Sequence, residues 1–121
     1  MNLKKILIVE DEDLVRKALE FRLKKEGYHV TACADGKQAI ETIDGSSFDL
    51  VITDMMLPYN NGLEVVTHLK NKSKETPIIV LTNIGLENVV LDAFNMGADD
   101  YMTKPFSPNE LSVRIKRLIK S

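Results

Sequence analysis

Residues 6–13 of the chain read ILIVEDED, four apolar residues followed directly by four acidic ones. An apolar run without polar alternation is typical of a strand buried on both faces, as in a parallel sheet. Comparable short runs recur at residues 29–33, 50–52, 78–81 and 101–103. We therefore predict five short strands, the first of which ends at an acidic cluster.

Segments with apolar residues at helical spacing follow each of these runs. The predicted helices cover residues 15–23, 37–43, 63–69, 90–94 and 111–119. Strand and helix thus alternate five times, which implies a parallel sheet with helices on both faces. Because right-handed crossovers leave few arrangements, we predict a doubly wound α/β fold of the flavodoxin-like type, with strand order 2-1-3-4-5.

The composition indicates one domain with a single core over residues 1–121, since 44% of the 121 residues are hydrophobic. There are 16 Lys and Arg against 18 Asp and Glu, a formal net charge of −2. This balance disfavours direct binding to nucleic acid or to an anionic membrane, because phosphate groups attract basic surfaces. We find neither a signal peptide pattern nor an apolar run long enough to span a bilayer, and we expect a cytoplasmic protein.

Three carboxylates are expected at one edge of this sheet. In the order 2-1-3-4-5, ligands bind beyond the carboxyl ends of strands 1 and 3. Glu10 and Asp11 follow the first predicted strand, and Asp54 follows the third. Neighbouring strands lie about 5 Å apart, so the three groups should share a pocket. Such a pocket needs a cation or raised pKa values, and Mg²⁺ suits it because this ion accepts one or two carboxylates and keeps several waters.

Two more polar residues should reach the same edge, Thr82 after the fourth predicted strand and Lys104 after the fifth. The set permits phosphoryl transfer onto a carboxylate, with Asp54 as the nucleophile. Mg²⁺, Lys104 and Thr82 would each take charge from an oxygen of the transferred group. Singly, each residue has an ordinary explanation as a turn residue, strand residue or surface charge, and Glu12 and Asp13 suit a helix start. Their coincidence at one edge favours a site.

Four stretches of the sequence stand out, namely residues 6–13, residues 49–58 with Gly62, residues 79–82, and residues 97–106, which read GADDYMTKPF. With these stretches the chain resembles, over its whole length, the receiver domains of bacterial two-component response regulators. The resemblance implies a signalling switch and not an enzyme, one that catalyses only its own phosphorylation and dephosphorylation. A sensor histidine kinase or a phosphotransfer protein would phosphorylate Asp54. The fourth helix, fifth strand and fifth helix would then relay the signal to an output domain or a partner protein.

The resemblance also implies a Mg²⁺ site. Glu10 and Asp11 would be its acid pair, and Asp11, Asp54 and the backbone carbonyl of Met56 would bind the metal.

Further roles implied by the resemblance concern the phosphoryl group and the switch. Lys104 and Thr82 would hold the phosphoryl group, and Tyr101 would turn inward on activation together with Thr82. The peptide bond between Lys104 and Pro105 would be cis, which proline allows at low energetic cost.

Some residues depart from the family pattern. Asn83 stands where a small residue is usual and would narrow access to the pocket. Met56 and Ile84 are apolar at positions that tune the loss of phosphate, which predicts a long-lived phosphorylated state. A phosphorylation-dependent homodimer through the surface that carries Asp100 and Arg114 is also implied, although Val90 replaces a basic residue common there.

Three alternatives stay open at this point. In a haloacid-dehalogenase-like phosphatase, Asp11 would be the nucleophile in the pattern Asp11-x-Asp13, but Asp54 would then have no role. A flavodoxin-like flavin binder would need a first loop rich in Ser, Thr and Gly, where this chain has four acids. A receiver domain that serves only for docking would not need Asp54, Thr82 and Lys104 together.

Overall fold

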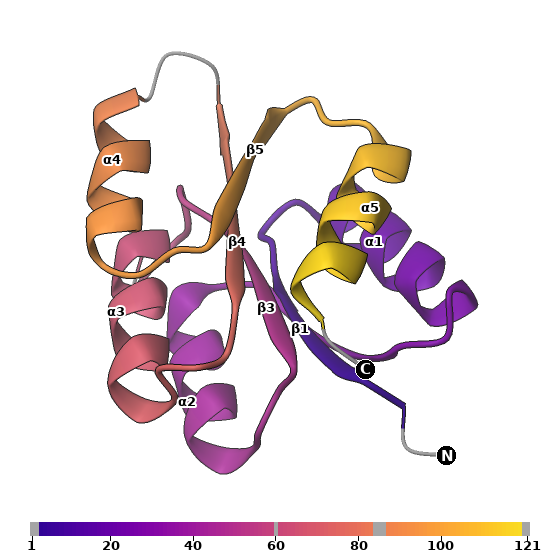
Figure 1. Cartoon of the computed structure of the whole chain (residues 1–121), viewed down its shortest axis with the longest axis horizontal. Helices are drawn as coiled ribbons and strands as arrows, with labels where there is room; N and C mark the ends of the chain where they lie inside the picture. Colours follow the sequence, from indigo (N-terminus) through magenta and orange to yellow (C-terminus); the bar gives the residue numbers. More distant parts are fainter. Residues whose placement is uncertain (1–2, 60, 84–86, 120–121) are drawn as a thin grey trace.

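The computed structural model describes residues 3–59, 61–83 and 87–119, which form a five-stranded parallel sheet between two layers of helices (Figure 1). The strands are β1 (Lys5–Val9), β2 (His29–Cys33), β3 (Leu50–Asp54), β4 (Ile78–Asn83) and β5 (Asp100–Lys104). The helices are α1 (Asp13–Lys25), α2 (Gly36–Gly45), α3 (Gly62–Lys72), α4 (Glu87–Asn95) and α5 (Pro108–Leu118). The strand order β2-β1-β3-β4-β5 confirms the predicted doubly wound topology.

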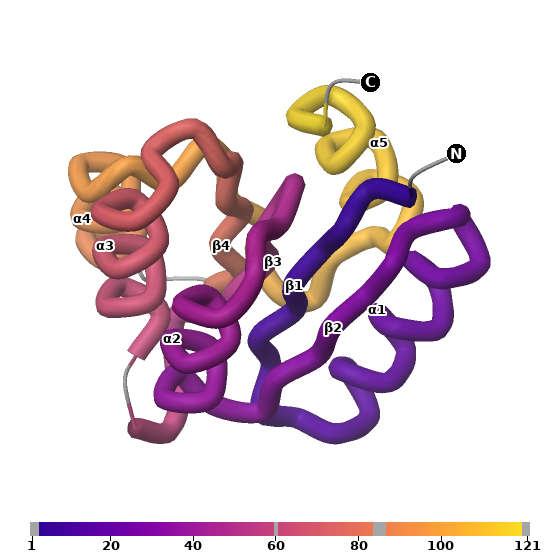
Figure 2. The backbone as a smooth tube through the Cα atoms, turned by 90° about the horizontal axis from the view of Figure 1, so that it is seen from below, coloured from indigo at the N-terminus to yellow at the C-terminus, as the bar shows by residue number. Residues whose placement is uncertain are grey.

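The unalternated apolar runs are explained by burial on both faces of the sheet. Figure 2 shows α1 and α5 on one side of the sheet and α2, α3 and α4 on the other. In β1, Leu7 and Val9 belong to the core beneath α2, α3 and α4, whereas Ile6 and Ile8 belong to the core beneath α1 and α5. All four side chains are fully buried, so both faces of this strand require apolar residues.

Three strands extend further at their carboxyl ends than the apolar runs predict. Asp54 is the last residue of β3 and pairs with Leu81 of β4. Thr82 lies within β4, and Lys104 ends β5 opposite Asn83. The expectation that these polar residues follow the strands was therefore wrong by one or two residues. The reason is that backbone pairing continues where side chains turn polar, because the ladder hydrogen bonds do not depend on side-chain type.

The predicted helices all lie inside observed ones, apart from Ile119, which is the C-cap of α5 and not part of the helix. Among the helices in the described part of the chain, none combines the length and the apolar character needed to cross a membrane.

Candidate functional site

Three carboxylates meet at the carboxyl end of the sheet. Glu10, Asp11 and Asp54 each offer an oxygen atom, and these atoms all lie within 4.8 Å of one another. Glu10 is fully buried and Asp54 is 5% exposed, while Asp11 is exposed. The juxtaposition follows from the pairing of β1 with β3, whose ends deliver the three groups to one place.

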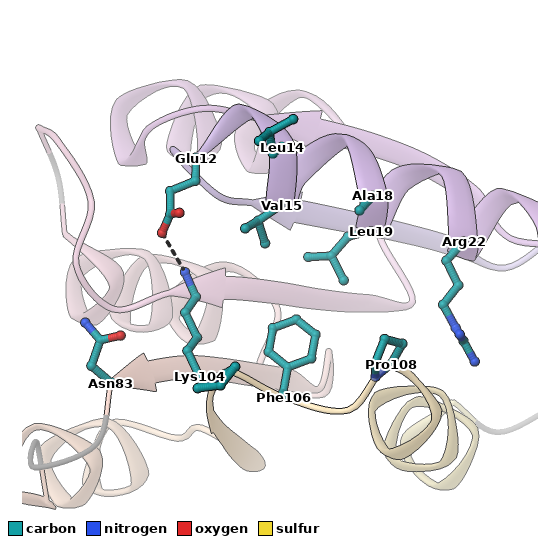
Figure 3. A pocket seen from close by; sticks show the side chains of 11 residues that line it. Glu12, Leu14, Val15, Ala18, Leu19, Arg22, Asn83, Lys104, Phe106 and Pro108 are labelled. Carbon is teal, nitrogen blue, oxygen red and sulfur yellow. Dashed lines mark ion pairs between the residues drawn. The ribbon is translucent and has the colours of Figure 1, made fainter.

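The ammonium group of Lys104 lies between two of these carboxylates. Its Nζ donates to Oε1 of Glu10 and to Oδ2 of Asp54, both at 2.6 Å. Figure 3 shows a further ion pair with Glu12, at 3.6 Å. Burial alone would lower the pKa of Lys104, but the hydrogen bonds to Asp54 and Glu10 outweigh it and raise that pKa above its ordinary value. Lys104 therefore provides a permanent positive charge beside Asp54.

The buried carboxyl group of Glu10 has a raised pKa, mainly because burial penalises its charged form. The hydrogen bond from Lys104 and one from the backbone N–H of Glu12, at 3.1 Å, act in the opposite direction. Both oxygens of Glu10 thus have donors, whereas the Asp11 carboxylate has no hydrogen-bond donor among the described residues. One ammonium cannot balance three ionised carboxylates. This set of hard oxygen donors fits a hard divalent cation such as Mg²⁺.

The position of Asp54 is fixed by its backbone. The hydroxyl of Thr53 donates to the Asp54 carbonyl at 3.0 Å, and the N–H of Met55 donates to the Leu81 carbonyl at 2.9 Å. Helix α3 then begins at Gly62, whose N–H donates to the Met55 carbonyl at 3.0 Å. A Cβ atom at Gly62 would lie only 2.3 Å from the carbonyl oxygen of Asp54. Glycine is therefore required here for the close approach of α3 to the end of β3.

Thr82 and Tyr101 lie on the neighbouring strands β4 and β5, and neither makes a hydrogen bond to Asp54 among the described residues. Thr82 is 2% exposed, and its hydroxyl donates to the Asn83 carbonyl at 3.4 Å. Tyr101 is 40% exposed and packs edge-on against Phe94 of α4, with ring centroids 5.8 Å apart. Tyr101 thus points outward in this state of the molecule.

The remaining residues singled out from the sequence surround the site. The backbone N–H of Met56 donates to Oδ1 of Asp54 at 3.3 Å, and the Met56 side chain is exposed. The peptide bond between Lys104 and Pro105 is cis. Asn83 is exposed at the end of β4, while Ile84 lies outside the described residues.

One neighbour of the site escaped the sequence analysis. Arg16 of α1 donates from Nη1 to the carbonyl of Glu10 at 2.9 Å and approaches that of Asp11 at 3.5 Å. It also pairs with Asp13. The spacing of Asp13 and Arg16 is that of a helical ion pair, which could have drawn attention to it, but the contact with the loop carbonyls depends on how the loop folds back.

An apolar groove of about 570 Å³ adjoins Lys104, between α1 and the connection from β5 to α5. Figure 3 shows Val15 and Leu19 of α1 on one side and Phe106 on the other. Leu14, at the rim, is 86% exposed. The charged site thus borders an uncovered apolar surface.

The sequence of this chain matches the model of the response regulator receiver domain over residues 6–116. The chain belongs to the response regulator receiver domain family. Such receiver domains are phosphorylation-dependent signalling modules of two-component systems, and they interact with histidine kinases and output domains. Membership of this family leaves the phosphatase and flavin-binding alternatives without support.

Individual relatives agree with this assignment. The receiver domain is 40% identical over 115 residues to the transcriptional regulatory protein SrrA of Staphylococcus aureus, covering 95% of this chain and 47% of that protein. It thus spans about half the length of that curated relative. The receiver domain of the sensor histidine kinase PA1611 from Pseudomonas aeruginosa, described with a magnesium ion coordinated in its active site cleft, is 31% identical. Its TM-score is 0.89, with 99% of this chain and 100% of that chain covered. The BeF3-activated DrrB receiver domain is 34% identical, with a TM-score of 0.90 and the same coverage.

Proposed function

We propose that this receiver domain accepts a phosphoryl group on Asp54 from a sensor histidine kinase or a phosphotransfer protein, in a reaction that requires Mg²⁺. The observation that carries the proposal is the contact of Lys104 with both Asp54 and Glu10 at 2.6 Å, within a group of three carboxylates. A buried carboxylate paired with a partly buried ammonium, at the edge of a sheet where ligands bind, suits phosphoryl transfer better than a purely structural role. Response regulators generally act in the cytoplasm, and we propose the same location here.

In the proposed reaction, a carboxylate oxygen of Asp54 attacks the phosphorus atom of a phosphohistidine. The new O–P bond forms as the P–N bond to the imidazole breaks, and the donor histidine leaves with the electron pair of that bond. Lys104 is already placed beside Asp54 and would bind an oxygen of the incoming group. Glu10, Asp11, Asp54 and the carbonyl of Met56 would hold Mg²⁺, which when bound would supply further positive charge toward the phosphoryl oxygens.

The switch that we propose uses Thr82 and Tyr101. Within residues 3–59, 61–83 and 87–119, the one hydrogen bond found for the Thr82 hydroxyl is the long one to the Asn83 carbonyl, so a phosphoryl group on Asp54 would compete for it as a stronger acceptor. The movement of Thr82 would make room for Tyr101 to leave Phe94 and turn inward. Phosphorylation would thereby shift the population between two arrangements of α4, β5 and α5, the face that contacts an output domain or partner.

We further propose a phosphorylation-dependent homodimer through this face, held mainly by apolar contacts. Asp100 accepts two hydrogen bonds from Arg114 of the same chain at 2.8 Å, and Glu110 accepts another at 2.9 Å. These charges are already paired within one protomer. Leu91 and Val113, at 60% and 65% exposure, remain uncovered and would form the contact.

The direct test is phosphorylation by acetyl phosphate with Mg²⁺, followed by intact mass. We expect one phosphoryl group on the wild-type protein and none on Asp54→Asn. Asp92→Asn, the same change at an exposed acid of α4, is the matched control and should be modified like wild type. An adduct that persists in Asp54→Asn would overturn the assignment.

A further inference from the structure

We propose that Arg16 is a positioning residue for the metal site, which holds the loop between β1 and α1 in the shape that presents Asp11. The inference rests on the proposed function, because it concerns the Mg²⁺ that the acid pair would bind. Arg16 itself contacts neither Asp54 nor Lys104 in the described structure, and its action is through the backbone of the two acids.

The guanidinium group of Arg16 folds back over the loop instead of extending into solvent. Its side chain is only 17% exposed, although the next residue, Lys17, is exposed and its side chain has no hydrogen bond or ion pair among the described residues. Nη1 lies 2.9 Å from the carbonyl of Glu10 and 3.5 Å from that of Asp11, while Nη2 pairs with Asp13. One side chain thereby connects both carbonyls of the acid pair to the first turn of α1.

The contacts of Arg16 matter because α1 lacks the side-chain N-cap that usually holds the start of a helix. Glu12 occupies the N-cap position of α1, yet its side chain makes no capping hydrogen bond. Glu10 is held from the other side, by its N–H to the Cys33 carbonyl at 3.0 Å and by its buried side chain. Asp11 is exposed and gains no such support from packing. In the described part of the chain, Arg16 is the sole donor found for the carbonyls of Glu10 and Asp11.

The direction in which the Mg²⁺ affinity changes when Arg16 is replaced distinguishes a positioning role from a purely electrostatic one. Removal of a positive charge close to three carboxylates would, by electrostatics alone, make the site more negative and strengthen Mg²⁺ binding. If Arg16 holds the loop, its loss must instead weaken binding, because Asp11 would have to be ordered each time the metal binds. Loss of groups that orient metal ligands typically weakens metal affinity about tenfold or more.

The experiment is calorimetric titration of the unphosphorylated protein with MgCl₂, so that the readout does not depend on phosphorylation. We expect Arg16→Met to bind Mg²⁺ about tenfold more weakly than wild type. Lys17→Met, the same loss of charge at the next position of the helix, should bind within about twofold of wild type. Arg16→Lys retains the charge but not the fork that spans two carbonyls, and should be intermediate.

A second readout is the rate of phosphorylation by acetyl phosphate as a function of Mg²⁺ concentration. At saturating Mg²⁺ we expect Arg16→Met to approach the wild-type rate, with the half-saturating concentration raised about tenfold. Circular dichroism and urea unfolding of each variant would show whether it is folded, and Arg16→Lys carries the test if Arg16→Met is not.

Arg16→Met that binds Mg²⁺ as tightly as Lys17→Met, or more tightly, would overturn the inference and leave the proposed function intact. Arg16→Lys that binds Mg²⁺ with wild-type affinity would also overturn the inference. A positive charge at this position would then be sufficient for metal binding, without the two contacts of the guanidinium group. Wild-type protein that binds no Mg²⁺ would instead contradict the proposed function, and the inference would fall with it.

Discussion

At the scale of single residues, Lys104 decides the electrostatics of the site. Its ammonium group compensates Glu10, which is fully buried, and Asp54, which is nearly so. A buried ion pair that loses one partner leaves an uncompensated charge in a poorly solvated place. We expect Lys104→Met to lower the free energy of unfolding by about 3 kcal/mol at neutral pH without metal. Urea unfolding measures this.

The matched control for Lys104 is Lys17→Met, which removes an exposed lysine without described partners. It should change the free energy of unfolding by less than about 0.5 kcal/mol. A loss in Lys104→Met as small as in this control would show that the two carboxylates do not depend on Lys104.

The side chain of Met56 bears on the lifetime of the phosphorylated state. It is 60% exposed beside Asp54 and cannot offer a hydrogen bond to a water placed in line with the acyl phosphate. We expect Met56→Asn to lose phosphate faster than wild type after the donor is removed, and Met56→Asn with Ile84→Glu faster still. Met96→Asn, the same change at an exposed position beyond α4, should match wild type. Equal rates in all four proteins would show that apolar bulk here does not set the lifetime.

At the scale of elements, the start of α3 determines where β3 presents Asp54. Any Cβ at Gly62 would overlap the carbonyl of Asp54 and the Cα of Met55, so α3 or the end of β3 must move. We expect Gly62→Ala to be destabilised by about 2 kcal/mol and phosphorylated more slowly. Gly45→Ala, at the last residue of α2, meets nothing within 4 Å and should be neutral or slightly stabilising. A Gly62→Ala protein as stable and as reactive as Gly45→Ala would contradict this account.

Helix starts show how far local sequence rules extend. Asp35 and Ser107 are the N-caps of α2 and α5, and each side chain accepts the backbone N–H three residues further along, from Gln38 and Glu110. The capping box at the start of α3, between Asn61 and Glu64, follows the same rule and was overlooked. The acidic start of α1 did not follow it, because Glu12 makes no side-chain cap.

At the scale of the whole molecule, the proposed relay runs from Asp54 through Thr82 to Tyr101 and the surface of α4. The tertiary contact that would have to break is the edge-on packing of Tyr101 against Phe94. We expect beryllofluoride with Mg²⁺ to shift amide resonances in α4, β5 and α5 as well as around Asp54. In Tyr101→Ala, the shifts near Asp54 should persist while those in α4 become smaller. Wild-type shifts confined to the surroundings of Asp54 would mean that no relay exists.

The sequence by itself determined the five strands, their parallel order and the meeting of Glu10, Asp11 and Asp54 at one edge. The periodicity of apolar residues identifies the strands and helices. The rules for right-handed crossovers then leave few possible strand orders. Even so, the sequence placed the strand ends too early, because burial and backbone pairing both continue through the polar residues Thr53, Asp54 and Thr82.

Only the tertiary structure decided which partners the site residues have. Lys104 and Glu10 are separated by 94 positions in the chain, and their contact at 2.6 Å exists because β1, β3, β4 and β5 pack side by side. Three further contacts also depend on tertiary structure. Tyr101 packs outward against Phe94, Asp100 pairs with Arg114, and Arg16 donates to the carbonyl of Glu10. In each case the side chain has several possible partners within hydrogen-bonding or packing distance. The packing of helices and strands against one another determines which partner it contacts, and sequence spacing does not encode this packing.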